Sequence, residues 1–186
     1  MLVVYDNLGI YSSPRVWWLF KVMGFNNIAV LNGGLPEWIK HNYPQQANLN
    51  NDNYPVGNFE VNFQSALVKS KKQIETNGID QKYLVIDARF ENRFYGKIKE
   101  NRADLISGHI PNAVNVPYAS VLDKHIFLLP KKLKSVLHHD GRPLIVYCGS
   151  GVTACIVILA YALINVHTSS IYDGSWAEWG QKNELL

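Results

Sequence analysis

The chain has 186 residues, of which 47% are hydrophobic and 18% charged, and its formal net charge is +3. This balance excludes a disordered chain, and neither a nucleic-acid-binding nor a membrane-spanning protein is expected, because there is no basic stripe and no long apolar run. The two cysteines, Cys148 and Cys155, form neither a CxxC pair nor a zinc pattern with histidines, so we expect no metal, no cofactor, no disulfide framework and a reducing compartment.

The first predicted unit covers residues 1–44. It contains an apolar strand from Val3, a polar loop at Asp6, an amphipathic helix, a second strand, and a Gly turn followed by a helix that carries Trp38. The unit has no further strands or helices before this first strand. We therefore expect residues 1–44 to be the C-terminal half of a domain whose first half is absent from this chain.

The Asn-rich stretch at residues 45–57 predicts a linker, and residues 58–186 predict a complete domain. Strands alternate with helices in this domain, which favours an α/β fold with a parallel sheet and helices on both faces. The predicted elements before its polar loop are strands at 59–63, 82–87 and 113–117, a helix at 65–78 and a helix at 130–141.

Residues 145–179 repeat the pattern of the first unit. Each copy has an apolar strand ending in Tyr, a polar loop, a helix, a strand, and a Gly turn before Glu-Trp. Trp38 follows Asp6 by 32 residues, and Trp179 follows Cys148 by 31. This agreement predicts that the N-terminal unit is a partial second copy of the fold.

Cys148 follows the apolar strand of the second copy, at the sheet edge where open parallel sheets bind ligands. Gly149, Ser150 and Gly151 can turn their amides inward, and the helix from about Thr153 adds its positive N-terminus. Both effects favour a thiolate and a bound persulfide, so we expect the pKa of Cys148 to fall below the free value of about 8.5. Cys155 lies among Ile and Val and is expected to pack in the core.

A cysteine phosphatase would use the same geometry but needs an arginine six residues after the cysteine to hold the phosphoryl oxygens. That position is Ala154. The loop carries no cation, so the phosphatase alternative is largely excluded.

Four stretches resemble the second domain of the tandem rhodanese-like sulfurtransferases: "DARFENRF", "GHIPNAVNVP", "YCGSGVTA" and "YDGSWAEW". The stretches "VVYD", "YSSPRVWW" and "LNGGLPEW" resemble the back half of the first domain of that family. Within it, the neutral C-G-S-G-V-T loop is similar to that of 3-mercaptopyruvate sulfurtransferases, and Asp6 stands where the first copy would carry the cysteine. The resemblance implies a rhodanese-like fold with a non-catalytic first domain.

The resemblance also implies the site residues and the reaction. Sulfur would pass from 3-mercaptopyruvate to Cys148 as a persulfide, and then to a thioredoxin-like thiol acceptor or to cyanide, with release of pyruvate. Ser150 would hydrogen-bond to the leaving group or relay a proton to it. The implied substrate-binding residues are Arg93, Arg102, Gly149, Gly151, Val152 and Thr153.

Asp87, Arg89 and His109 are expected to brace the structure rather than to take part in chemistry. In the family, an acid and a histidine of the first domain complete a proton relay. They would lie before Met1, so we expect low activity from this chain. A thiosulfate sulfurtransferase and a non-catalytic rhodanese-like interaction fragment stay open as alternatives, in the cytoplasm or a mitochondrion.

Overall fold

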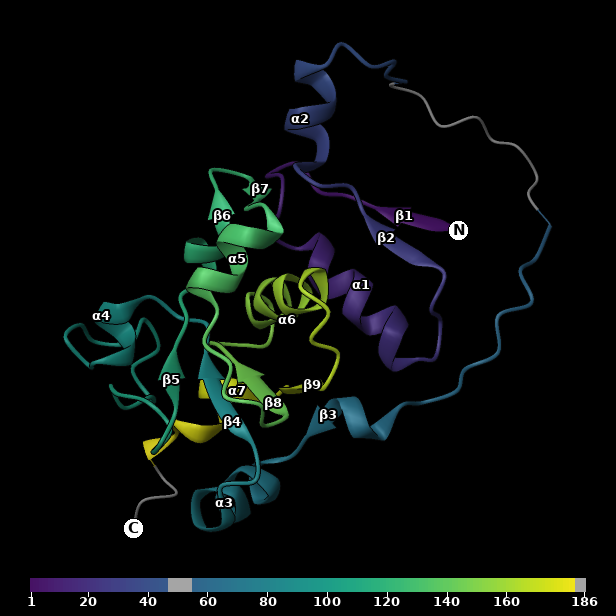
Figure 1. Cartoon of the computed structure of the whole chain (residues 1–186). Coiled ribbons are helices and arrows are strands. Elements are labelled where there is room, and N and C mark those ends of the chain that lie inside the picture. Colours follow the sequence, from purple (N-terminus) through teal and green to yellow (C-terminus); the bar gives the residue numbers. More distant parts are fainter. Residues whose placement is uncertain (47–54, 183–186) are drawn as a thin grey trace.

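The structure is a computed structural model that describes residues 1–46 and 55–182 (Figure 1). Most of the predicted linker and the last four residues of the predicted second domain lie outside the described residues. None of the helices in the described part is long and apolar enough to cross a membrane.

Five parallel strands form the central sheet in the order β3-β9-β8-β4-β5. The inner strands β4, β8 and β9 are buried on both faces, as is typical of strands in parallel sheets, and β4 and β8 are short, largely apolar runs. Their bounds are β3 Val68–Lys69, β4 Leu84–Asp87, β5 Val114–Asn115, β8 Leu144–Tyr147 and β9 Ser169–Tyr172. The predicted strands at 82–87 and 113–117 are confirmed in β4 and β5.

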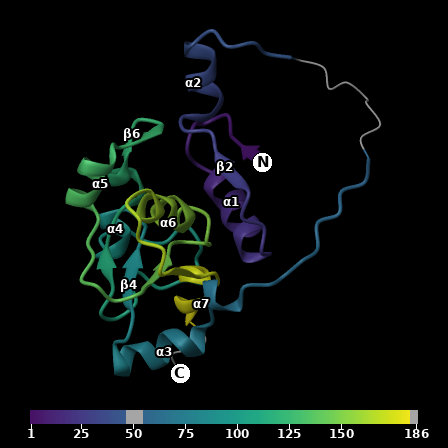
Figure 2. The same cartoon turned by 45° about the vertical axis from the view of Figure 1, so that its right-hand side comes forward.

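Helices cover both faces of this sheet, as predicted (Figures 1 and 2). Side chains of a strand alternate between faces. Leu144 and Val146 of β8 therefore pack with one cluster, and Ile145 and Tyr147 pack with another. The first cluster is covered by α1 Ser13–Val22, α5 Pro130–Val136 and α6 Ala154–Leu163, and the second by α3 Lys71–Asp80 and α7 Ser175–Trp179.

The N-terminal segment forms a separate two-stranded parallel sheet and packs on the main domain through α1. Trp18 and Val22 of α1 are buried in the same core cluster as α6, and α1 lies beside α6 in both views (Figures 1 and 2). The remaining elements of this segment are β1 Leu2–Val4, β2 Ile28–Val30 and α2 Gly34–Lys40. The order strand, helix, strand, helix agrees with the predicted pattern, whereas its origin as half a domain stays a prediction.

A hairpin of β6 Leu122–Asp123 and β7 Ile126–Phe127 makes a second junction with the N-terminal segment. His125 at its turn contacts Glu37 of α2, with 3.0 Å between Nε2 and Oε2. The amide of Phe127 donates to Oδ1 of Asn32 at 2.9 Å. The two parts of the chain are therefore joined at α6 and at this hairpin.

The predicted strand at 59–63 is wrong, because the edge of the sheet beside β9 is taken by β3. Residues 59–63 have no regular structure and run past the end of α1 instead. There the amides of Asn62 and Gln64 donate to the carbonyls of Met23 and Val22. Nearby, the ring of Phe59 packs against that of Phe25.

The helix predicted at 65–78 starts and ends later than expected, because α3 spans Lys71–Asp80. Ser70 and Gln73 form a capping box that fixes its start. The residues before Ser70 form a 3₁₀ turn at Ser65–Leu67 and strand β3. A short α4 at Glu91–Phe94 and a 3₁₀ turn at Tyr118–Val121 complete the described elements.

The helix predicted at 130–141 ends earlier, because α5 stops at Val136. Leu137 leaves the helix in an extended conformation and places its side chain in the core. Gly141 has a φ of +91° and lies in the turn before β8, so it is not the residue that stops the helix.

Candidate active site

Cys148 lies where the sequence predicts it, directly after β8 and six residues before the start of α6. Thr153 is the N-cap residue of α6. Cys148 is only 2% exposed and contacts the core cluster under α6. Burial alone would suit a packing role as well, so its chemistry has to be judged from the loop around it.

The carbonyl groups at the start of the Cys148 loop are fixed by helix α7. Cys148 O accepts a hydrogen bond from the amide of Trp176, and Gly149 O accepts one from Ala177, both at 3.0 Å. In a trans peptide the N–H points opposite to the C=O. The amides of Gly149 and Ser150 therefore point away from α7.

The amides of residues 149–153 donate to no acceptor within the described parts of the chain. These amides precede the first turn of α6, where backbone N–H groups have no partner within the helix. Such donors ahead of a helix N-terminus form a site for an anion. The geometry supports the predicted set of inward-facing amides around Cys148. The amides of residues 149–153 are called the amide cradle.

Ser175 holds the backbone of Cys148 and was missed by the sequence analysis. The amide of Cys148 donates to Oγ of Ser175 at 3.3 Å, and that hydroxyl donates to Tyr172 O at 2.9 Å. Ser175 is fully buried with a φ of +53°, which costs a non-glycine residue about 1 kcal/mol or more. The fold keeps this strained residue directly behind the cysteine.

Arg93, a predicted substrate-binding residue, lies against the Cys148 loop. A Cβ atom built on Gly149 would lie 3.4 Å from Nη2 of Arg93 and 3.5 Å from Nη1. Nη1 donates to no acceptor among the described residues. The guanidinium is therefore beside the cradle with one nitrogen available for a carboxylate.

Glu100 fixes Arg93 in this position. Its side chain is 2% exposed, and its Oε2 lies 2.5 Å from Nη2 of Arg93 while its Oε1 lies 2.9 Å from Nη1 of Arg89. A buried carboxylate between two guanidinium groups holds both in one geometry. No local pattern in the sequence points to Glu100, which follows Arg93 by seven residues.

Asp87 and Arg89 brace the structure, as expected. Arg89 is buried, donates to both carboxylate oxygens of Asp87 and to Gly108 O, and lies 4.2 Å from the ring centroid of Trp176. Burial alone would lower the pKa of Arg89, but the hydrogen bond and charge of Asp87 outweigh it and raise the pKa. Arg89 therefore stays charged and anchors Glu100.

The other predicted substrate-binding arginine, Arg102, is not brought to the loop. Its side chain is 57% exposed and pairs with Asp104 at 2.7 Å. No hydrogen bond or ion pair of the described residues joins it to residues 148–153. A role for Arg102 stays a prediction.

The remaining predicted site residues form the outer part of the loop. Ser150 is exposed, and its hydroxyl makes no hydrogen bond to the described residues. Val152 and Thr153 are half-buried, and Gly151 is buried with a φ of +81° that favours glycine. Ser150 thus faces solvent at the mouth of the cradle.

Cys155 and His109 have the structural roles predicted for them. Cys155 is fully buried in α6, its sulfur lies 3.2 Å from Gly151 O, and burial raises the pKa of its thiol to about 12. His109 stacks on Phe94 with Nδ1 2.9 Å from the carbonyl of that residue. The described residues contain no group of three side chains suited to hold a metal ion.

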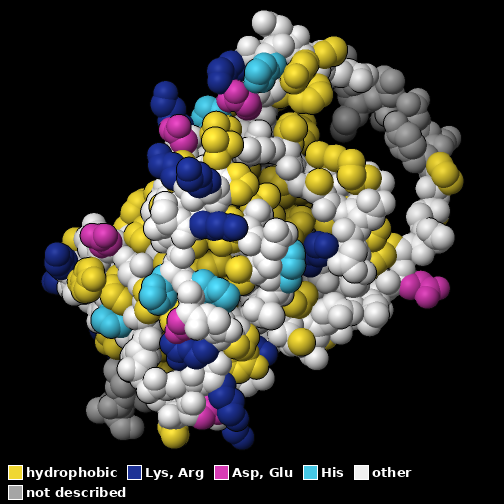
Figure 3. Space-filling view, viewed as in Figure 1, with side chains coloured by type: hydrophobic (Ala, Val, Ile, Leu, Met, Phe, Trp, Pro, Cys, Tyr) yellow, Lys and Arg dark blue, Asp and Glu magenta, His cyan; other side chains and the backbone are white. Residues whose placement is uncertain are grey.

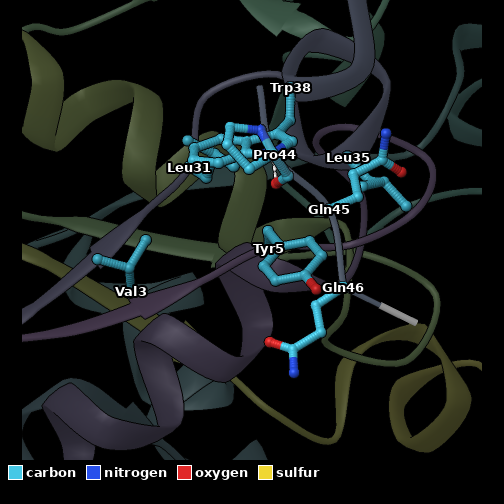
Figure 4. Close-up of a pocket in the computed structure, with 8 residues that line it drawn as sticks. All are labelled: Val3, Tyr5, Leu31, Leu35, Trp38, Pro44, Gln45 and Gln46. Carbon is cyan, nitrogen blue, oxygen red and sulfur yellow. Dashed lines mark hydrogen bonds between the residues drawn. The ribbon is translucent and has the colours of Figure 1, made fainter. Parts of the chain in front are cut away.

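A cavity of about 580 Å³ lies on the N-terminal segment, away from Cys148 (Figure 4). Tyr5, Trp38 and Pro44 are among its lining residues, and Nε1 of Trp38 donates to Pro44 O. Hydrophobic side chains are also exposed on this part of the surface (Figure 3). None of the residues that line this cavity belongs to the Cys148 loop. The cavity is therefore not the candidate active site.

Similarity to known proteins identifies the family of this chain. The family model described as "Rhodanese-like domain" matches residues 1–41 and 69–182. Human 3-mercaptopyruvate sulfurtransferase is 34% identical over 185 residues, and rat thiosulfate sulfurtransferase is 36% identical over 186; each match covers 96% of this chain and 62% of the relative. This chain thus spans less than two thirds of the length of those relatives.

A solved structure gives the same result in three dimensions. The 3-mercaptopyruvate sulfotransferase SseA from Escherichia coli, described as having the rhodanese fold, superposes with a TM-score of 0.80 at 31% identity. The match covers 94% of this chain and 66% of that one.

Proposed function

The chain belongs to the rhodanese-like domain family, and from this premise we propose that it is a sulfurtransferase that takes sulfur from 3-mercaptopyruvate. One observation carries the proposal: Cys148 lies at a loop of unpaired amides, with the guanidinium of Arg93 against Gly149. An anionic sulfur and a carboxylate are the two groups that this arrangement would hold.

In the first half of the reaction, Arg93 binds the carboxylate of 3-mercaptopyruvate, and Arg102 assists if it moves toward the loop. The thiolate of Cys148 attacks the sulfur of the substrate. A new S–S bond forms, the C–S bond breaks, and its electron pair stays on carbon as the enolate of pyruvate. The enolate takes up one proton to give pyruvate.

Ser150 is proposed to hydrogen-bond to the leaving enolate or to relay this proton. Its exposed hydroxyl at the mouth of the loop makes it available to a bound substrate. Gly149 and Gly151 let the chain wrap closely around the sulfur, and Val152 and Thr153 contribute amides to the cradle. The same amides would stabilise the terminal sulfur of the persulfide as an anion.

In the second half, an acceptor thiolate or cyanide attacks the outer sulfur of the Cys148 persulfide. The S–S bond breaks, the acceptor becomes a persulfide or thiocyanate, and the Cys148 thiolate is restored. We propose a thioredoxin-like protein as the thiol acceptor. We also propose the cytoplasm or a mitochondrion as the compartment, because the two cysteines of the chain are free, as is typical of a reducing compartment.

Thiosulfate sulfurtransferase is the second candidate, supported by the name of the rat relative. Thiosulfate is a dianion, and the loop Cys148–Thr153 has no cation of its own to pair with it. The neutral loop therefore favours 3-mercaptopyruvate. In both cases sulfur would rest on Cys148.

The test is to incubate the protein with each donor separately and to weigh the peptides that contain Cys148 and Cys155. We expect one added sulfur atom on Cys148, formed faster with 3-mercaptopyruvate than with thiosulfate. Faster loading by thiosulfate would favour the second candidate. A Cys148 that gains sulfur from neither donor would leave the chain as a non-catalytic interaction fragment.

A further inference from the structure

The Cys148 loop is in contact with a residue from the other end of the chain. Arg15 in α1 places Nη1 2.5 Å from Oδ1 of Asp173 and 3.3 Å from Gly151 O. Asp173 follows β9, next to the loop, whereas Arg15 precedes the loop by more than a hundred residues. The N-terminal segment thus contributes directly to the loop that carries the cysteine.

Besides the thiol of Cys155, three groups contact the guanidinium of Arg15. Its central carbon lies 4.8 Å from the ring centroid of Trp18, which is itself buried between α1 and the core. Asp173 holds one edge and Gly151 O accepts from the same nitrogen. A stacked and paired arginine has little freedom left, so it can hold a backbone carbonyl in one orientation.

Gly151 is fitted closely to this pair. A Cβ atom on Gly151 would lie 2.7 Å from Oδ1 of Asp173 and 3.0 Å from Nη1 of Arg15. The carbonyl of Gly151 faces Arg15, and the next amide, that of Val152, points the opposite way in the same trans peptide. That amide is one of the donors of the cradle.

We propose that Arg15 is a positioning residue of the sulfur-carrying loop, which holds the Gly151 carbonyl so that the Val152 amide points at the anion on Cys148. The inference rests on the proposed function, because it assigns a donor to the sulfur transfer. Helix α7 fixes the first two peptide units of the loop, and Arg15 contacts this later one, whose carbonyl also lies 3.2 Å from the sulfur of Cys155. The pair with Asp173 is neutral overall, so Arg15 acts through geometry rather than by adding net positive charge.

The test compares Arg15→Ala and Arg15→Lys with Arg142→Ala. Arg142 pairs with Asp140 at 2.6 Å in the turn before β8, with its side chain 38% exposed against 22% for Arg15, so its variant controls for the loss of one Arg–Asp pair. Each folded variant is loaded with 3-mercaptopyruvate, and the rate and KM of persulfide formation on Cys148 are measured. The wild-type protein is measured first, because failure of the wild type to load would contradict the proposed function itself.

We expect Arg15→Ala to load about tenfold more slowly at saturation, with a KM within about twofold of the wild type because Arg93 still binds the carboxylate. Arg15→Lys should recover part of the rate, and free guanidinium at about 20 mM should partly rescue Arg15→Ala but not wild type. Arg142→Ala should load like the wild type. Asp173→Asn should also slow persulfide formation on Cys148, but by less than Arg15→Ala, because Asp173 acts by holding Arg15.

Two outcomes would overturn the inference while leaving the proposed function intact. In one, folded Arg15→Ala loads sulfur as fast as Arg142→Ala, which would make Arg15 only a link between α1 and the domain. In the other, Arg15→Ala raises KM and leaves the saturated rate unchanged, which would place Arg15 in substrate binding. Circular dichroism at the assay temperature confirms that each variant is folded.

Discussion

The Asp6 loop and the Cys148 loop share a backbone design but differ in what occupies it. Gly9 follows Asp6 by three residues with a φ of +100°, and Gly151 follows Cys148 by three with a φ of +81°. In both places a short strand enters the loop and a helix of ten residues leaves it.

A short helix later in each copy holds the loop in the same way. The carbonyl of Asp6 accepts a hydrogen bond from the amide of Leu35 in α2, as the carbonyl of Cys148 does from α7. The helix residue just before that donor has a φ of +54° at Gly34 and +53° at Ser175. The first loop uses glycine for this conformation, and the second uses a serine whose hydroxyl bonds to Cys148.

The two loops differ in what their backbone amides bind. The carboxylate of Asp6 accepts hydrogen bonds of 2.9 to 3.1 Å from four amides, those of Leu8, Tyr11, Ser12 and Ser13. The amides of residues 149–153 have no acceptor in the described structure. The first loop thus fills its own anion site, whereas the amides of the second are left for the anionic sulfur that the proposed function requires.

The largest effect is expected when Cys148→Asp copies the first loop into the second. The carboxylate should take the unpaired amides, so the variant should fold while sulfur transfer falls to background. Thermal unfolding and the mass of the Cys148-containing peptide after donor treatment measure both results. Ile156→Asp is the matched control: it buries a carboxylate among the apolar side chains of the core, with no amides to receive it, and should unfold the protein.

Arg93→Ala should give the next largest effect, because the guanidinium beside Gly149 distinguishes the second loop from the first. We expect kcat/KM for 3-mercaptopyruvate to fall about 10- to 100-fold, the effect of losing a charged hydrogen-bond partner, and far less for thiosulfate. Steady-state kinetics with both donors tests this. Equal losses would count against Arg93 as the carboxylate-binding residue, and Arg102→Ala measured in parallel reports whether the exposed arginine takes part.

Asp6→Asn should have a moderate effect on stability that depends on pH. Burial alone would raise the pKa of Asp6, but hydrogen bonds from Ser13, Tyr11 and Leu8 outweigh it and lower the pKa below its ordinary 3.8. The stabilisation is therefore complete above about pH 4 and is lost as the pH falls through the lower folded-state value.

We expect Asp6→Asn to reduce the free energy of unfolding by about 1–2 kcal/mol at pH 7, and by progressively less as the pH falls below 3.8. Urea unfolding of both proteins across this range measures the difference. A gap that stays constant with pH would show that the carboxylate charge is not what the amides bind.

The smallest effect is expected from Ser175→Gly, which gives the second loop the glycine of the first. Glycine accepts the positive φ, so this variant should be about 1 kcal/mol more stable than Ser175→Ala, which keeps the strain. Both lose the hydroxyl that holds Cys148, and both should load sulfur a few-fold more slowly than wild type. Wild-type loading by either variant would leave Ser175 with a packing role alone.

Local signals in the sequence were enough to predict the sheet and the loop. Strands β4 and β8 are continuous apolar runs between polar turns, and the Gly-rich loop before α6 marks the carboxyl end of β8. The pairing of Asp87 with Arg89 is also local, because the two residues are two positions apart. These features follow from neighbours in the chain.

The errors and omissions depend on contacts between distant residues. The strand predicted at 59–63 fails because Val68 and Lys69 occupy the edge beside β9, a choice that no local pattern encodes. Arg15 and Glu100 were missed because their partners are set by tertiary packing. For Arg15 a weak signal exists: it is the third residue of α1, whereas the third residue of α6 is the apolar Ile156, so a charge replaces an apolar residue at this position of the helix.

Because α1 contacts the Cys148 loop, the packing of α1 on the domain and the binding of an anion by the loop are thermodynamically linked. An anion that orders the loop must strengthen the attachment of α1 by the same free energy by which α1 strengthens anion binding. Hydrogen exchange in α1, far along the chain from Cys148, should therefore slow when the loop is loaded. The N-terminal segment would then report on the sulfur atom without touching it.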